Sequence, residues 1–180
     1  MSKLEYYHQK FGAARVQSMV PAMTKNFAEV GVKYSMGGMT GSTLDSHRLA
    51  TWAKDKHGLQ KQDEVMTHMF QAYFSDEKFL GDRAVLVAAA EAAGLPAEDA
   101  RKMLEDEQAY LGEVQAELSM AQQLQVSGVP FFVFHPPAGV SGRPLGVSGA
   151  QPTETIVEIL SDDLGLDEEH SDVAEAAASR

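Results

Sequence analysis

A chain of 180 residues, of which 44% are hydrophobic, is long enough to bury the core of one domain. Its formal net charge of −11 disfavours binding to nucleic acid or to an anionic membrane surface. The chain contains no cysteine, which excludes a disulfide framework, a thiolate metal site and a dithiol–disulfide couple of its own.

The sequence carries no sign of a membrane segment or a leader. No apolar run reaches the roughly 18 residues that a membrane-spanning helix needs. The first residues, Met1-Ser-Lys-Leu-Glu-Tyr-Tyr-His8, are too polar for a signal peptide. We therefore expect a cytoplasmic protein, unless the natural start lies upstream of Met1 and includes a targeting segment.

The N-terminal part of the chain is predicted to be helical. Residues 3–11 form a short segment that we interpret as a frayed helix or an arm. Over residues 13–30, apolar side chains recur every three or four positions, which is typical of an amphipathic helix. Pro21 interrupts this pattern, so the helix either bends there or begins near Val20. A loop rich in glycine and methionine follows at residues 32–41.

Two longer helices are predicted next. The first runs from a plausible N-cap at Ser42 or Thr43 to His57. Its predicted buried residues are Leu49, Trp52 and Ala53. The second spans residues 61–74 and has the strongest amphipathic pattern of the chain. Its apolar face consists of Val65, Met66, Met69, Phe70, Tyr73 and Phe74.

Three more helices are predicted before the C-terminal third. Residues 82–93 form an alanine-rich helix that ends at Gly94, and another helix begins at Ala97, directly after Pro96. A long amphipathic helix is predicted over residues 107–126. Its inward-facing residues would be Leu111, Val114, Leu118 and Ala121.

The C-terminal third begins with a predicted buried strand. Phe131 to Phe134 are apolar, favour β-structure and are too few for a helix. Pro130 precedes this strand, a position where its missing N–H is tolerated. On the tripeptide alone, an ordinary trans bond between Val129 and Pro130 is the more common form, and a cis bond is the alternative.

A second short strand is predicted at residues 146–148, after a loop rich in proline and glycine. A helix is predicted over residues 153–164. The remaining tail, residues 166–180, is acidic and then rich in alanine, so we expect it to be disordered.

Five stretches of the sequence resemble one known family. They are DSHRLATWAKDKHGLQ (45–60), MFQAYFSDEKFLGD (69–82), AAEAAGLP (89–96), GVPFFVF (128–134) and VSGAQ (147–151). Together they are similar to the DsbA-like oxidoreductases, in the FrnE-like branch that acts in polyketide pathways. The resemblance implies an α/β, mostly helical chain with a thioredoxin fold and a large helical insertion.

The resemblance also implies a domain organisation. A DsbA-like thioredoxin domain would occupy residues 1–165, with a helical insertion at about 13–126 and a closing strand–strand–helix unit at 127–164. Family members begin with a strand, a Cys-x-x-Cys motif on a helix and a second strand, and we expect this N-terminal βαβ segment to be missing here. The strand at 131–134 would then have an open edge, which a second copy or residues 3–11 would cover.

The function implied by the resemblance is that of a disulfide oxidoreductase, inactive as this chain because it has no cysteine. In the family the loop around the cis proline, here Val129 and Pro130, receives the backbone of the substrate peptide. We therefore predict these two residues as substrate-binding and predict no catalytic residue. The partner would be a thiol- or disulfide-containing protein or a small-molecule thiol, and a homodimer is a further option.

Two alternatives remain open at this point. One is a non-catalytic peptide-binding module on the same fold. The other is a relative of the glutathione-dependent isomerases and transferases, whose serine-type site would have been lost with the N-terminal segment. None of Ser127, Ser141 and Ser148 lies in the sequence context of a nucleophile elbow.

Histidines and methionines offer little further evidence of a site. No pair of histidines has the i, i+4 spacing of a helical metal site, so we expect no metal and no cofactor. His47 is expected to pack or cap against the core, and His135 to lie in a loop. The methionines are expected to fill the core, apart from Met36 and Met39, whose loop could line an adaptable groove.

Overall fold

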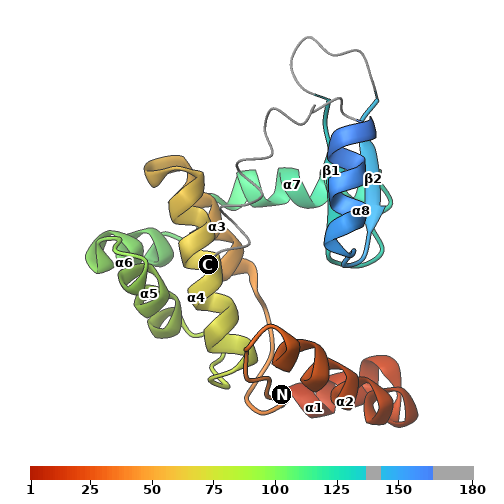
Figure 1. The fold of residues 1–180 in the computed structure, drawn as a ribbon. Helices are drawn as coiled ribbons and strands as arrows, with labels where there is room; N and C mark the ends of the chain where they lie inside the picture. Colours follow the sequence, from red (N-terminus) through yellow and green to blue (C-terminus); the bar gives the residue numbers. More distant parts are fainter. Residues whose placement is uncertain (137–142, 164–180) are drawn as a thin grey trace. The chain divides into compact units, whose positions relative to one another are not determined.

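A computed structural model describes residues 1–136 and 143–163 of the chain. The protein is α/β and mostly helical, with helices α1 to α7 before a two-stranded sheet and helix α8 after it (Figure 1). The chain divides into two compact units, residues 1–119 and 120–180, and each is described by itself. The predicted tail and the expected helix end at Leu164 lie outside the described residues.

The first unit begins with helices α1 (Lys3–Phe11) and α2 (Ala13–Glu29), which lie side by side. A capping box starts α1: the N–H of Glu5 donates to Oγ of Ser2, and the N–H of Ser2 donates to Oε2 of Glu5. Residues 3–11 are therefore a capped helix. Helix α2 continues through Pro21. The helix therefore begins at Ala13 and not near Val20.

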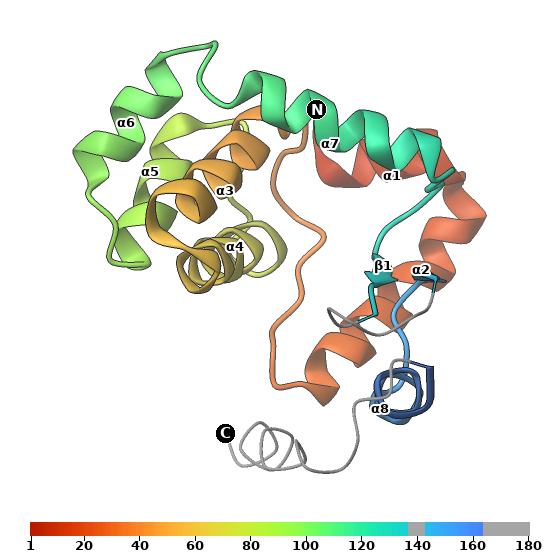
Figure 2. The same cartoon turned by 90° about the horizontal axis from the view of Figure 1, so that it is seen from above.

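Four helices form the core of the first unit: α3 (Leu44–His57), α4 (Leu59–Phe74), α5 (Arg83–Ala92) and α6 (Ala97–Glu105). Figure 2 shows them gathered into one bundle. The predicted buried face of α3 is confirmed, because Leu49, Trp52 and Ala53 all lie in this core. At the start of α3 the N–H of Leu44 donates to Oγ of Ser42, whereas the side chain of Thr43 makes no cap.

The predicted apolar face of α4 is too wide. Val65 and Met69 are fully buried in the bundle, but Phe70 is 50% exposed. Val65 and Met69 are four residues apart and share one face, whereas Phe70 is displaced around the helix by a further 100°. Its ring packs instead beside that of Phe74, with the ring centroids 5.9 Å apart.

Helix α7 (Leu111–Gln123) is shorter than the predicted helix at 107–126. The residues before it form a turn, in which Tyr110 has a φ of 58°. Backbone carbonyls of this turn accept hydrogen bonds from Arg48 and so do not serve a helix. Val114 is buried as predicted, but Leu118, one turn further on, is 51% exposed, so its predicted inward orientation is wrong.

The described part of the second unit contains strands β1 (Phe131–Phe134) and β2 (Leu145–Ser148) and helix α8 (Thr153–Glu158), which continues as a π-helical turn. The strands pair antiparallel, with Phe131 opposite Ser148 and Phe134 opposite Leu145. Both strands lie where the sequence predicts them. The prediction that β1 is buried is wrong, because Phe132 and Val133 are exposed on a strand with a single partner strand among the described residues.

Candidate functional site

The loop between α7 and β1 is the part of the second unit to which the sequence assigns substrate binding. The peptide bond between Val129 and Pro130 is cis, the isomer that the family resemblance implies. The carbonyl of Pro130 accepts a hydrogen bond from the N–H of Gly149 at 2.8 Å, which ties the loop to the end of β2. Val129 and Pro130 therefore lie together at the head of the sheet.

Val129 is the most exposed large apolar residue of this region, at 89%. Within residues 1–136 and 143–163, its backbone N–H and carbonyl make no hydrogen bond. An exposed side chain contributes little to packing, so the fold itself places few demands on this residue. The N–H and the carbonyl of Val129 are therefore available for hydrogen bonding next to the start of β1.

The pairing of β1 with β2 decides which backbone groups of β1 remain available. In an antiparallel pair, alternate residues direct both backbone groups toward the partner strand. The bond from Gly149 to the carbonyl of Pro130, together with the register, assigns Phe132 and Phe134 to the side of β2. The N–H and carbonyl of Phe131 and Val133 therefore point to the opposite edge, in line with those of Val129.

We call the edge formed by Val129, Phe131 and Val133 the open edge of β1. Within the described part of the chain, no other strand pairs with it. The strand is apolar on both faces: Phe132 and Phe134 stack with ring centroids 6.3 Å apart, while Phe131 and Val133 share the other face. Gly146 gives the ring of Phe131 room, because a Cβ there would lie 3.0 Å from its Cζ.

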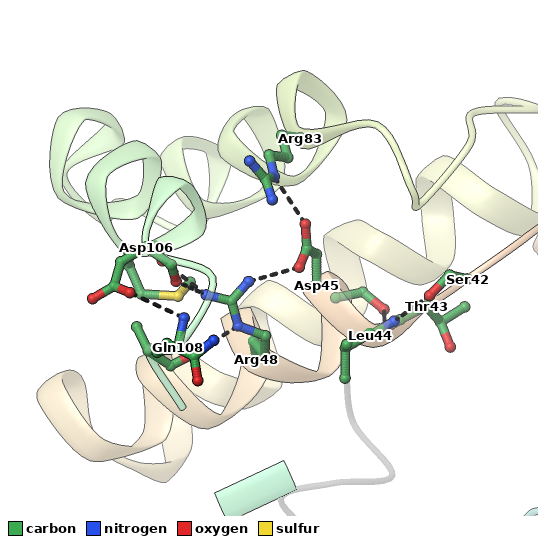
Figure 3. Close-up of polar contacts among 11 residues, drawn as sticks. Ser42, Thr43, Leu44, Asp45, Arg48, Arg83, Asp106 and Gln108 are labelled. Carbon is green, nitrogen blue, oxygen red and sulfur yellow. Dashed lines mark hydrogen bonds and ion pairs between the residues drawn. The ribbon is translucent and has the colours of Figure 1, made fainter. Parts of the chain in front are cut away.

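A second polar feature lies in the first unit and is centred on Arg48 (Figure 3). Its guanidinium, on a residue only 1% exposed, donates from Nε to the carbonyl of Ala109 at 2.7 Å and from Nη2 to the carbonyls of Met103, at 3.1 Å, and Asp106. Its Nη1 donates to Oδ1 of Asp45 at 2.7 Å. Arg48 thereby fastens the turn between α6 and α7 to α3.

Asp45 is shared between two arginines. Its Oδ2 accepts a hydrogen bond from Nε of Arg83, at the start of α5, at 2.9 Å (Figure 3). Burial raises the pKa of the Asp45 carboxyl, but the hydrogen bonds and charges of Arg83 and Arg48 outweigh burial and hold that pKa below its ordinary value. This ion triad connects α3, α5 and the turn before α7, and it serves the fold of the helical unit.

The histidine prediction at this place is wrong. His47 is exposed and neither packs nor caps the core, because on α3 it points away from the face that carries Leu49 and Trp52. The buried charged residue at this place is its neighbour Arg48. The sequence signal that could have revealed it is the spacing of Asp45 and Arg48, three residues apart on one helix face.

The remaining candidates lie in the first unit or in a loop. His135 follows β1 and is exposed. Met69 and Met103 fill the core as expected, while Met39 is exposed and Met36 lies 3.7 Å from the hydroxyl of Tyr34. Among the described residues, no three histidine, aspartate or glutamate side chains gather as metal ligands would. Nor is any described helix long and apolar enough to cross a membrane.

Comparison with known proteins assigns the family. The family model of the DSBA-like thioredoxin domain matches residues 2–161, which includes both the helical unit and the sheet with its cis proline. The chain belongs to the DSBA-like thioredoxin domain family. No curated protein matches the chain.

As a DSBA-like thioredoxin domain, the protein has a mostly helical first unit and a small sheet. Its membership supports the relation to oxidoreductases that the sequence indicated. The 180 residues contain no cysteine, so this chain has no thiolate to attack a disulfide.

Proposed function

We propose that this DSBA-like chain binds an extended segment of a thiol- or disulfide-containing protein at the open edge of β1, as part of the thiol–disulfide chemistry of the FrnE-like branch. The observation that carries this proposal is the aligned set of backbone groups on Val129, Phe131 and Val133, which have no strand partner among residues 1–136 and 143–163. Val129 and Pro130 are its substrate-binding residues. Dithiol exchange itself requires a thiolate that these 180 residues do not supply.

The physical basis of such binding is strand addition. An extended peptide that pairs with a free strand edge gains main-chain hydrogen bonds, which give affinity without requiring a particular sequence. The apolar side chains of β1 add cross-strand contacts, with Phe132 and Phe134 on one face and Phe131 and Val133 on the other. We therefore expect a preference for peptides with alternating apolar residues over uniformly polar ones.

A second candidate uses the same surface as a non-catalytic peptide-binding module. The lack of cysteine in the sequence favours it. The two candidates differ in what they require of the peptide. A substrate site for thiol–disulfide chemistry should discriminate between a peptide that contains a disulfide and the same peptide with serine in place of cysteine, whereas a general binding module should bind both equally.

Two substitutions at one position test the role of the backbone. Val129→Pro removes the N–H that would pair with a peptide, and Val129→Ala shortens an 89% exposed side chain while keeping that N–H. Binding of a fluorescein-labelled, disulfide-containing peptide is followed by fluorescence anisotropy, with circular dichroism as the check of folding. The proposal predicts wild-type affinity for Val129→Ala and an affinity at least about fivefold lower for Val129→Pro, the loss of one hydrogen bond of about 1 kcal/mol.

Equal affinity of the two folded variants would show that the N–H of Val129 takes no part in binding. Absence of binding by the wild-type chain to disulfide, dithiol and serine versions of the peptide would refute the proposed function itself.

A further inference from the structure

The chain's first three residues are laid along the loop between α2 and α3. Ser2 forms an antiparallel β-bridge with Met39. On either side of it, the N–H of Lys3 donates to the carbonyl of Gly38, and the N–H of Thr40 donates to the carbonyl of Met1, each at 3.0 Å. The start of α1 is thus held by the segment that leaves α2, which closes the two helices into a hairpin.

Lys3 is one of the few charged residues of the described chain that are fully buried, at 1% exposure. Its Nζ donates to the carbonyl of Tyr73 at 2.6 Å and to the carbonyl of Ser35 at 3.2 Å. The same ammonium lies 4.4 Å from the centroid of the Tyr73 ring, a cation–π distance. Two hydrogen bonds and the face of one aromatic ring therefore stabilise the ammonium at the C-terminal end of α4. The helix dipole also favours a cation there.

Burial lowers the pKa of Lys3, and the nearby carboxylate of Glu77 partly opposes that effect. Glu77 also holds the loop in place, because its Oε1 accepts a hydrogen bond from Oγ of Ser35 at 2.6 Å. Ser35 in turn donates its N–H to the carbonyl of Phe74 at 2.7 Å. Lys3, Ser35 and Glu77 together make one polar junction between the hairpin and the end of α4.

Away from this junction, the hairpin meets the bundle through aromatic side chains only loosely. Phe27 of α2 lies 5.5 Å from Phe74 of α4, measured between ring centroids. Beside this contact is a cavity of about 270 Å³, lined by Phe27, Val32, Thr67, Phe70, Gln71 and Phe74. The core of the first unit is built from α3 to α6 and their connections, and no residue of α1 or α2 belongs to it.

We propose that the hairpin α1–α2 opens from the α3–α6 bundle as a unit, and that Lys3 is the positioning residue that holds it closed. The buried ammonium ties three segments at once: α1, the loop before α3, and the last turn of α4. Opening breaks the junction and the contact of Phe27 with Phe74, while the core of the bundle stays intact. Opening carries Phe27 and Val32 away from the cavity and uncovers the ring of Phe74 on the bundle, so the hairpin acts as a lid over an aromatic surface.

Native-state hydrogen exchange of the wild-type chain at low denaturant concentration tests whether the hairpin opens separately. The proposal predicts that amides of residues 3–40 exchange through a common opening of lower free energy than the amides of α3 to α6. If residues 3–40 and the bundle instead exchange through one global unfolding reaction, the hairpin is not a separate unit and the proposal is overturned.

The role of Lys3 is tested by Lys3→Met, with Lys10→Met as the matched control, because Lys10 is exposed on the same helix. We expect Lys3→Met to speed exchange of residues 3–40 by about tenfold to a hundredfold, the range for losing hydrogen bonds from a charged group. Exchange in the core of α3 to α6 should stay unchanged, and Lys10→Met should resemble wild type. Uniformly faster exchange across the first unit, or no change, would refute the role of Lys3; if the variant does not fold, the wild-type exchange pattern decides.

Discussion

The Nη1 atom of Arg48 lies 2.7 Å from Oδ1 of Asp45, one turn earlier on α3, and the Arg48 side chain is almost completely withdrawn from water. The other guanidinium contacts are backbone carbonyls that lie more than 50 residues further along the chain. Burying a charge is costly, and these hydrogen bonds offset that cost; removing one member leaves the others unpaired in a poorly solvated place.

Replacing Arg48 should therefore destabilise the helical unit strongly. We expect Arg48→Met to lower the free energy of unfolding by about 3 to 5 kcal/mol, the usual loss when one partner of a buried pair is removed. Arg48→Lys should lower the free energy of unfolding by less than Arg48→Met does, but still below that of wild type, because an ammonium cannot reproduce the forked geometry of the guanidinium. Urea denaturation followed by circular dichroism measures both.

Arg101→Met is the control for this prediction, since Arg101 pairs with Glu98 on the surface of α6. Exposed pairs contribute between zero and about 1 kcal/mol. A loss for Arg48→Met no larger than for Arg101→Met would contradict the structural role assigned to Arg48.

Asp45 should make stability depend on pH in the acid range. Because its folded pKa lies below the ordinary value of 3.8, folding favours the ionised carboxylate. The resulting stabilisation is fully present above about pH 4 and is lost as the pH falls through the folded pKa. We expect the difference in unfolding free energy between wild type and Asp45→Asn to stay constant from pH 7 to 5 and to shrink below pH 4. If the unfolding free energies of wild type and Asp45→Asn differ by the same amount below pH 4 as above it, the ion triad does not stabilise the fold as described.

Gly38 should tolerate no side chain. Its φ is +83°, and a Cβ there would meet the backbone carbonyl of Glu77. Gly38→Ala is expected to cost on the order of 1–3 kcal/mol, because both the conformation and the space are unsuitable. Gly112→Ala, in the first turn of α7 with nothing near its Cβ, should leave stability unchanged or raise it by up to about 1 kcal/mol. Thermal melts of the two variants compare them directly, and equal effects would contradict the predicted contact with Glu77.

The open edge of β1 should also attract a second copy of the chain. An apolar strand edge without a partner recruits other strands, and a lysine on such an edge suppresses the pairing. We expect light scattering to show a mass that rises with protein concentration, and Val133→Lys to abolish the rise. Val157→Lys, at an exposed position of α8, is the control and should leave it in place. A mass that stays monomeric at every concentration would exclude this association.

The sequence revealed local features well and tertiary ones poorly. The place of β1 followed from four apolar residues of β-favouring type, and Val129 and Pro130 lie at its head as predicted. The exposure of Phe132 was not predictable in this way, because burial of a strand side chain depends on what packs against that face of the sheet.

The same limit explains the two buried cations. Arg48 is buried because the carbonyls of the turn before α7 converge on it, and Lys3 because Ser35 and Tyr73 do. Neither arrangement leaves a hydrophobic periodicity in the sequence, and only the spacing of Asp45 and Arg48, three residues apart, gives a local sign of one of them. His47 was chosen instead, one position away from the residue that faces the core.

Hydrogen exchange of the β1 amides, measured by nuclear magnetic resonance with and without an extended disulfide-containing peptide, tests the central claim most directly. The proposed site predicts slow exchange at Phe132 and Phe134 in the free chain, because they pair with β2, and fast exchange at Phe131 and Val133. Added peptide should slow exchange at Val129, Phe131 and Val133. Protection of Phe131 and Val133 already in the free chain, or peptide binding that leaves these three amides unchanged, would contradict it.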